Sequence, residues 1–122
     1  MKISGAESVV MEALWRRSPL TAEDIAAEVA GPQGWSEATV KTLINRLKRK
    51  KALSATPDGR RYLYRPVVAR ADYVHQESRS LIDRLYGGRI APFVTQLSER
   101  EPLSRDEIEE LKRLIERLDR DS

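Results

Sequence analysis

The chain has 122 residues, of which 40% are apolar and 34% charged, and its formal net charge at pH 7 is +3. This length suits one compact domain, or a small domain with an added assembly segment. It contains no cysteine and a single histidine, which excludes disulfides and thiolate metal sites, and we expect no cofactor. No apolar run approaches the roughly 18 residues of a membrane helix, and the start lacks the apolar core of a secretion signal, so we expect a cytoplasmic protein.

Two helix starts are marked near the beginning of the chain. Ser4–Glu7 and Thr21–Asp24 each place a hydroxyl at the cap position and an acid three residues later, the pattern of a capping box. The first predicts a helix to about Arg17. The second predicts a shorter helix over residues 22–29, followed by a loop at Gly31–Gly34, whose composition is typical of turns.

A third helix is predicted from the cap residue Ser36 to about Lys51. Apolar side chains at positions i, i+3, i+4 and i+7 form its inward stripe, which consists of Val40, Leu43, Ile44 and Leu47. Because successive residues turn by about 100°, the opposite side is polar and basic. That outward side carries Ala38, Thr42, Asn45 and Arg49, flanked by Lys41 and Arg46.

A short hairpin should follow this helix. Leu53–Thr56 and Arg61–Arg65 are strand candidates, and Pro57–Arg60 between them predicts a turn, since proline fixes φ and glycine accepts a positive φ. In the second strand two tyrosines alternate with Leu63 and Arg65, so one pair should pack on the body while the other faces outward. The alternation leaves open which pair does so.

The rest of the chain predicts three further helices. They cover residues 71–85, ended by Gly87-Gly88, then residues 90–97, and a last stretch from the cap Ser104 to about Asp119. Apolar residues in the last helix follow 3-4-3 spacing, typical of a helix that packs along a partner helix. They could fold back on their own domain or bury against a second chain, and a mostly helical tail on an already complete domain favours dimerisation. The candidate dimer interface comprises Leu81, Leu85, Ile108, Leu111, Leu114, Ile115 and Leu118.

Charge divides along the chain in the same way. Ser36–Arg65 holds nine basic and two acidic residues, a net charge of +7, whereas Glu99–Ser122 holds nine acids and six bases, a net charge of −3. Three helices followed by a hairpin is the order of a winged helix-turn-helix. We therefore expect a mainly α fold with a small β-hairpin: a winged helix-turn-helix DNA-binding domain at residues 1–68 and a helical dimerisation domain at residues 69–122.

Positive charge on a helix and an adjacent hairpin indicates binding to double-stranded DNA. Arginine can bond guanine through two hydrogen bonds and asparagine can bond adenine in the same way, so the third helix could read base edges. Sequence specificity is expected mainly from Thr39, Thr42, Asn45 and Arg46. Phosphate contacts are expected from Lys41, Lys48, Arg49, Lys50, Arg60 and Arg61.

Two other classes of function remain open. A winged helix can also be a protein-interaction module that binds no DNA. An enzyme, such as a metal-dependent nuclease, is the other class, but His75 stands alone and no acidic cluster lies outside the solvated face of the last helix. The sequence therefore does not support catalysis.

The chain resembles the BlaI/MecI/CopY family of bacterial transcriptional repressors over nearly its whole length. The strings that carry the resemblance are ISGAESVVMEALWRRSPLTAEDIA, WSEATVKTLINRLKRKKAL, DGRRYLYRP and LSRDEIEELKRLIERL. It implies a homodimer that occupies a dyad operator and blocks transcription, commonly of β-lactamase or other resistance genes. The N-terminal winged domain would read DNA and the C-terminal helices would form the dimer.

The resemblance also implies a switch that relieves repression. In the β-lactamase branch, a membrane sensor with a metalloprotease domain leads to cleavage of the repressor between Asn and Phe. Aligning the shared Leu103-Ser104 and the Asp106–Leu111 string places that bond at Gln96–Leu97, so the Asn-Phe pair is absent. Either another sequence is cleaved here, or a ligand relieves repression instead. The copper-responsive branch carries C-terminal cysteines, and their absence argues against copper sensing.

Overall fold

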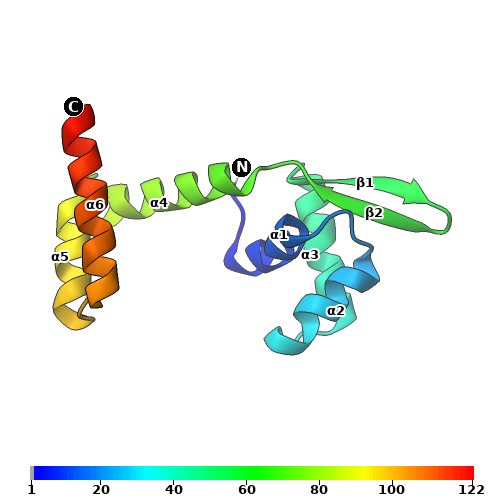
Figure 1. The fold of residues 1–122 in the computed structure, drawn as a ribbon. Helices are drawn as coiled ribbons and strands as arrows, with labels where there is room; N and C mark the ends of the chain where they lie inside the picture. Colours follow the sequence, from blue (N-terminus) through cyan, green and yellow to red (C-terminus); the bar gives the residue numbers. More distant parts are fainter. Residues whose placement is uncertain (1) are drawn as a thin grey trace. The chain divides into compact units, whose positions relative to one another are not determined.

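The computed structural model describes residues 2–122, which form six helices and one antiparallel hairpin (Figure 1). The predicted fold class, mainly α with a small β-hairpin, is confirmed. Residues 2–76 and residues 77–122 form two compact units. In chain order the elements are α1 (Gly5–Arg16), α2 (Ala22–Gln33), α3 (Glu37–Arg49), β1 (Leu53–Asp58), β2 (Arg61–Pro66), α4 (Arg70–Tyr86), α5 (Ile90–Arg100) and α6 (Arg105–Asp121).

Both predicted capping boxes are present at the starts of α1 and α2. The Ser4 hydroxyl accepts the Glu7 amide at 3.1 Å, and the Glu7 carboxylate accepts the Ser4 amide at 2.9 Å. At α2 the same two bonds join Thr21 and Asp24, each at 3.1 Å. Each box satisfies backbone N–H groups that the first turn of a helix leaves without partners.

α2 is longer than its predicted range, and the expected loop at Gly31–Gly34 is wrong for its first three residues, which are helical. Pro32 lies in the last turn, so the helix that its ring disturbs is nearly at its end. α2 ends one residue later at Gln33 and is capped by Gly34, whose φ of 68° is left-handed, and the next amide, of Trp35, bonds the Ala30 carbonyl at 2.9 Å.

The hairpin pairs β1 and β2 in a register from Leu53 opposite Pro66 to Asp58 opposite Arg61. The predicted four-residue turn is too long, since only Gly59 and Arg60 connect the strands. A two-residue loop with glycine first suits the φ of 65° at Gly59. β1 therefore extends two residues further toward the tip than predicted, whereas β2 begins at Arg61 as predicted and extends by Pro66 at its other end.

Packing at the root of the hairpin shows which strand residues face the body of the first unit. Tyr64 exchanges two backbone hydrogen bonds with Leu20, at 2.8 and 3.1 Å, and its ring packs against the core. Tyr62 shares that face of β2, and the Lys48 ammonium lies 5.5 Å from its ring centroid. Tyr64 therefore packs on the body of the first unit and Arg65 faces outward, while Tyr62, nearer the tip on the same face as Tyr64, is 49% exposed.

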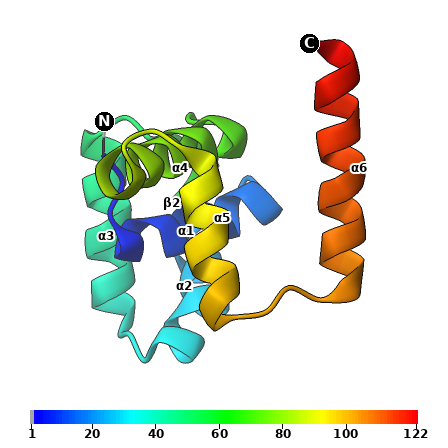
Figure 2. The ribbon, with the colours of Figure 1, turned by 90° about the vertical axis from the view of Figure 1, so that its left-hand side faces the viewer.

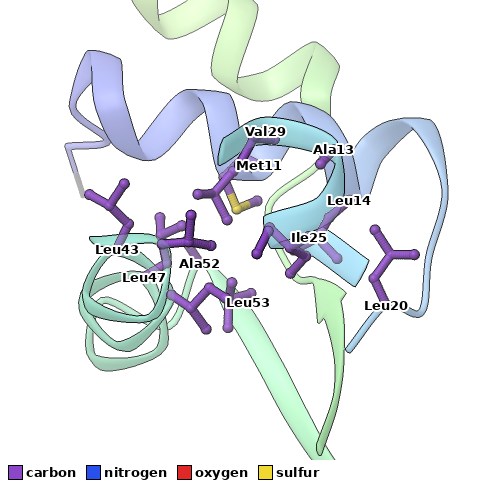
Figure 3. Close-up of a cluster of buried hydrophobic side chains, with 14 of the residues drawn as sticks. Met11, Ala13, Leu14, Leu20, Ile25, Val29, Leu43, Leu47, Ala52 and Leu53 are labelled. Atoms are coloured by element: carbon purple, nitrogen blue, oxygen red, sulfur yellow. The ribbon is translucent and has the colours of Figure 1, made fainter. Parts of the chain in front are cut away.

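The core of the first unit lies between α1, α2, α3 and the root of the hairpin (Figure 3). The predicted stripe of α3 is fully buried, and α1 and α2 supply the side chains opposite it. The largest fully buried apolar side chains are Met11, Leu14, Leu20, Ile25, Ile44, Leu47, Val10 and Val40. Trp15 and Trp35 pack against this core while remaining partly exposed.

The first turn of α4 belongs to the first unit, beyond the expected domain boundary at residue 68. The Trp15 indole N–H donates to the Val68 carbonyl at 2.9 Å, and its ring lies 5.5 Å from that of Tyr73. The Arg70 Nε donates to both carboxylate oxygens of Glu12, at 3.0 and 3.2 Å. These contacts join the start of α4 to α1.

The second unit has little core of its own. The predicted helices are present, and Figure 2 shows α5 and α6 joined by an extended segment. Within residues 77–122, Ile82 is the single buried apolar side chain, at 7% exposure. Large apolar side chains are exposed on all three helices of this unit, namely Leu85, Ile90, Val94, Leu97, Leu114, Ile115 and Leu118.

We expect Leu47→Ala to lower the free energy of unfolding by about 2–5 kcal/mol, because it leaves a cavity where a fully buried side chain packs. Arg49→Ala, on the exposed face of the same helix, should change it by less than about 0.5 kcal/mol. Urea denaturation followed by circular dichroism measures both. Equal losses in the two variants would contradict the packing described for α3.

Candidate nucleic-acid interface

α3 presents the candidate DNA-reading residues on one exposed side. Its start is fixed by Ser36, whose hydroxyl accepts the Thr39 amide at 3.2 Å. Burial of the apolar stripe then turns the opposite side of the helix to solvent. The residues predicted to contact DNA from α3 are all exposed: Thr39, Lys41, Thr42, Asn45, Arg46 and Arg49.

The polar groups on this side differ in how free they are to bind a ligand. The Thr42 hydroxyl donates to the Ala38 carbonyl at 3.0 Å, so its methyl group and oxygen lone pairs remain for an outside contact. The Thr39 hydroxyl lies 3.1 Å from that of Ser36. The side chains of Asn45 and Arg46 make no hydrogen bond or ion pair within residues 2–122. Their donors and acceptors are therefore available to base edges.

The hairpin tip carries the other predicted contacts, Arg60 and Arg61, both exposed. The Arg61 Nε donates to the Asp58 carboxylate at 3.3 Å, whereas the Arg60 side chain makes no such bond within residues 2–122. An exposed pair of this kind is weak and screened by salt, so a phosphate could replace Asp58 as the partner. Arg60 could bind a phosphate without first giving up a partner inside the protein.

Two lysines of α3 expected to bind phosphate have partners inside the protein. Lys48 lies over the ring of Tyr62, a cation–π arrangement that connects α3 to the β1–β2 hairpin, which is the wing of the fold. Lys50 is bound more tightly, because its ammonium lies 2.6 Å from Glu7 Oε1 and donates to the Lys2 carbonyl at 2.8 Å. Neither contact was predicted from the sequence, since both join residues far apart in the chain.

Glu7 is a buried carboxylate, 1% exposed. Burial raises its pKa, but the hydrogen bonds from Lys50 and Ser4 lower it by more, so the pKa lies below its ordinary value of 4.5. A depressed pKa in the folded state means that the charged form stabilises the fold. That contribution is present above the ordinary pKa and disappears as the pH falls through the folded-state pKa.

The candidate dimer residues remain largely uncovered in the second unit. Leu81, Ile108 and Leu111 are partly exposed, and Leu85, Leu114, Ile115 and Leu118 are exposed. A groove on α6 is lined by Leu103, Glu107, Glu110, Leu111, Leu114 and Arg117. Apolar side chains gathered along a helix in this way are typical of an association surface.

The candidate cleavage residues, Gln96 and Leu97, lie inside α5. The Gln96 side-chain oxygen accepts the Tyr86 hydroxyl at 3.0 Å, and Leu97 is 45% exposed. The bond between them is therefore in helical backbone at the surface. No helix within residues 2–122 is long and apolar enough to cross a membrane.

α3 buries its apolar stripe and presents a basic outer face. A helix and a turn precede it, and a hairpin with arginines at its tip follows it. This arrangement defines a winged helix-turn-helix DNA-binding protein. A family model described as penicillinase repressor matches residues 3–117. The chain belongs to this family of DNA-binding transcriptional repressors, which are not enzymes. The predicted resemblance is thereby confirmed.

Individual relatives are similar over nearly the whole chain. The penicillinase repressor of Bacillus licheniformis is 33% identical over 115 residues, covering 94% of this chain and 90% of that protein. The methicillin resistance regulatory protein MecI of Staphylococcus aureus (strain N315) is 33% identical over 114 residues, covering 93% of each.

Two solved structures resemble the winged part. The DNA-binding domain of the repressor BlaI in solution has a TM-score of 0.55 at 33% identity, covering 59% of this chain and 88% of that chain. Monomeric Bacillus licheniformis BlaI in complex with the blaP half-operator has a TM-score of 0.53 at 33% identity, covering 60% of this chain and 89% of that chain.

Glu7→Gln should lower the melting temperature at neutral pH, because it replaces the charged partner of Lys50. The difference from the unchanged protein should begin to shrink as the pH falls below about 4.5, the ordinary pKa, and disappear once the pH passes below the lower pKa of folded Glu7. Thermal melts from neutral pH to about pH 3 measure this. A difference that stays constant over that range would show that the charge of Glu7 does not stabilise the fold.

Proposed function

We propose that this protein is a cytoplasmic repressor that binds a dyad operator as a homodimer and blocks transcription. The observation that carries the proposal is the exposed face of α3, where amide, hydroxyl and guanidinium groups stand opposite a fully buried stripe. The relative BlaI binds a half-operator, and the same winged fold supports major-groove docking of α3 here.

The exposed residues are assigned two roles. Thr39, Thr42, Asn45 and Arg46 read base edges, because they combine donors, acceptors and a methyl group near the middle of α3. Lys41, Arg49, Arg60 and Arg61 contact phosphate and supply affinity that does not depend on sequence. The wing would extend the phosphate contacts beyond the groove that α3 occupies.

A homodimer is supported by the apolar residues that the second unit leaves in solvent. Ile115 and Leu118 are 62% and 60% exposed on α6, and Leu85 is 58% exposed at the end of α4. A second copy of the chain would bury them in a symmetric interface, with each apolar surface covering its equivalent. Two copies would also present two reading helices to the two halves of a dyad operator.

The names of the relatives support control of β-lactam resistance genes or other stress genes. Relief of repression could follow cleavage at Gln96–Leu97, with a membrane sensor-protease as partner. Because that bond lies in helical backbone, α5 would have to open locally before a protease could bind it as an extended strand. Induction by a ligand is the alternative, and incubation with the sensor's protease domain distinguishes the two.

The proposed function is tested by a mobility shift on DNA from upstream of the protein's own gene, with an unrelated duplex as control. We expect tighter binding to the upstream fragment and a linear fall of log affinity with log salt concentration. Equal, weak binding to both fragments would remove the repressor proposal. Absence of any binding at low salt would favour a protein-interaction module.

Arg46→Ala should reduce operator affinity by about 1–3 kcal/mol and relax the preference at one base position, because it removes a base contact. Arg60→Ala is the matched control, since it removes an arginine from the wing. It should weaken binding to all sequences and reduce the salt slope by about one unit. Titration of a set of single-base operator variants separates the two effects, and an equal loss for Arg46→Ala on every sequence would make it a phosphate contact.

Replacing Leu111 and Ile115 together by Lys should give a monomer and abolish operator binding, because like charges would face each other across the proposed interface. Sedimentation velocity measures the oligomeric state, and circular dichroism checks that the helices persist. Lys112→Ala on the same helix is the control and should leave the dimer intact. A persistent dimer in the double variant would place the interface elsewhere.

A further inference from the structure

The first turn of α1 and the end of α3 are joined by a charged pair that the proposed DNA contacts do not use. Glu7 lies in the first turn of α1, and Lys50 is the residue that ends α3. Their charged atoms are 2.6 Å apart, although the residues are 43 positions apart in the chain. The Glu7 side chain is 2% exposed and that of Lys50 is 37% exposed.

The Lys50 ammonium has two partners from the N-terminal segment. One is Glu7 Oε1, and the other is the Lys2 carbonyl oxygen at 2.8 Å. An ammonium group has three N–H donors, so two of the three are committed inside the protein. A DNA phosphate could therefore take only one donor without breaking an existing bond.

Other basic residues in this region are less constrained. The side chains of Lys41, Arg46, Arg49, Lys51 and Arg60 make no hydrogen bond or ion pair within residues 2–122. Lys51 follows Lys50 directly, and both are exposed. The two neighbouring lysines therefore share charge and position at the helix end but differ in their hydrogen-bond partners. This pair of neighbours offers a natural comparison.

We propose that Lys50 is a positioning residue of the DNA reader, which fastens the end of α3 to the N-terminal segment and does not neutralise a phosphate. This inference rests on the proposed function for its DNA consequence. Chain geometry at the helix end supports it. Lys51 adopts a left-handed φ of 64°, the next side chain, of Ala52, is fully buried, and Ile3 is buried in the same core. The chain therefore leaves α3 along a fixed path, beside the segment that Lys50 binds.

Electrostatics explains why a cation is needed beside Glu7. Glu7 is favourably placed in the first turn of α1, but the cap residue of α3 that it contacts lies at the negative end of that helix, where a carboxylate needs a cation beside it. Glu7 is buried, so water cannot supply that compensation, and Lys50 does so directly. Without the lysine, the buried carboxylate would have to be protonated or the two segments would have to separate. Separation of the segments would move the end of α3, and with it the base-reading residues nearest that end, Asn45 and Arg46.

Lys50→Gln and Lys51→Gln are the matched variants that test this proposal in the full-length protein. We expect Lys50→Gln to lower the melting temperature by on the order of 5–10 °C, whereas Lys51→Gln should leave it nearly unchanged. On an unrelated duplex, Lys50→Gln should keep the salt slope of the unchanged protein. A phosphate contact would instead reduce that slope by about 0.9.

Sequence specificity is the measurement that a loss of stability alone would leave unchanged. At a temperature where the variant is fully folded, Lys50→Gln should lower the ratio of affinities for the upstream fragment and the unrelated duplex by about fivefold or more, because misplaced base contacts affect only the former. Adding Glu7→Gln to Lys50→Gln should restore part of both the melting temperature and this ratio, since it removes the uncompensated charge.

An unchanged melting temperature with a reduced salt slope in Lys50→Gln would overturn the proposal and make Lys50 a phosphate contact. Lack of any rescue in the double variant would overturn it as well. If the unchanged protein bound neither duplex, the proposed function would fail, while the melts and the double variant would still report whether Lys50 fastens the helix end.

Discussion

Burial of one side of α3 is the constraint on which the rest of the structure depends. Val40, Leu43, Ile44 and Leu47 are at most 4% exposed. Each such side chain contributes roughly 1.5–3 kcal/mol by leaving water, which is large against a typical domain stability of 5–15 kcal/mol. The helix therefore cannot rotate about its axis without losing the fold. Its rotation fixes which polar groups face solvent, so the candidate DNA-binding face is set before any DNA is present.

The two units satisfy the need to bury apolar surface in different ways. Residues 2–76 enclose a complete core between three helices and the hairpin root. Residues 77–122 bury Ile82 and leave long apolar side chains in solvent along α5 and α6. The first unit is thus self-sufficient, whereas the second leaves exposed the apolar surface that the proposed dimer would bury. The net charge divides in the same way, because residues 2–76 hold 13 basic and 8 acidic residues, whereas residues 77–122 hold 9 basic and 11 acidic residues.

Much of this organisation could be predicted from the sequence, because it depends on local patterns. The capping boxes, the stripe of α3 and the order of helices and hairpin all follow from residues a few positions apart. The extension of α2 through Pro32 could not, because Gly31 and Gly34 are both candidates to end the helix and the local pattern does not choose between them. β1 is longer than predicted because the turn needs only two residues.

Contacts between distant residues account for what the sequence left open in the candidate site. The alternation in β2 did not say which side chains face inward, and the packing of the Tyr64 ring against the core decides it. The charge pattern identified the basic residues of α3 but treated them alike. The structure separates them, because Lys48 lies over Tyr62 and Lys50 meets Glu7, while Arg46 and Arg49 have no partner within residues 2–122.

The pairing of Leu20 with Tyr64 also helps the protein to avoid aggregation through the edges of its hairpin. A hairpin has two outer edges whose unpaired backbone groups can recruit a strand from another molecule. On the outer edge of β2, Leu20 already takes both backbone groups of Tyr64. On the outer edge of β1, Pro57 has no N–H to offer, and charged Asp58 follows it. The wing can therefore project toward DNA as exposed β-structure without becoming a template for aggregation.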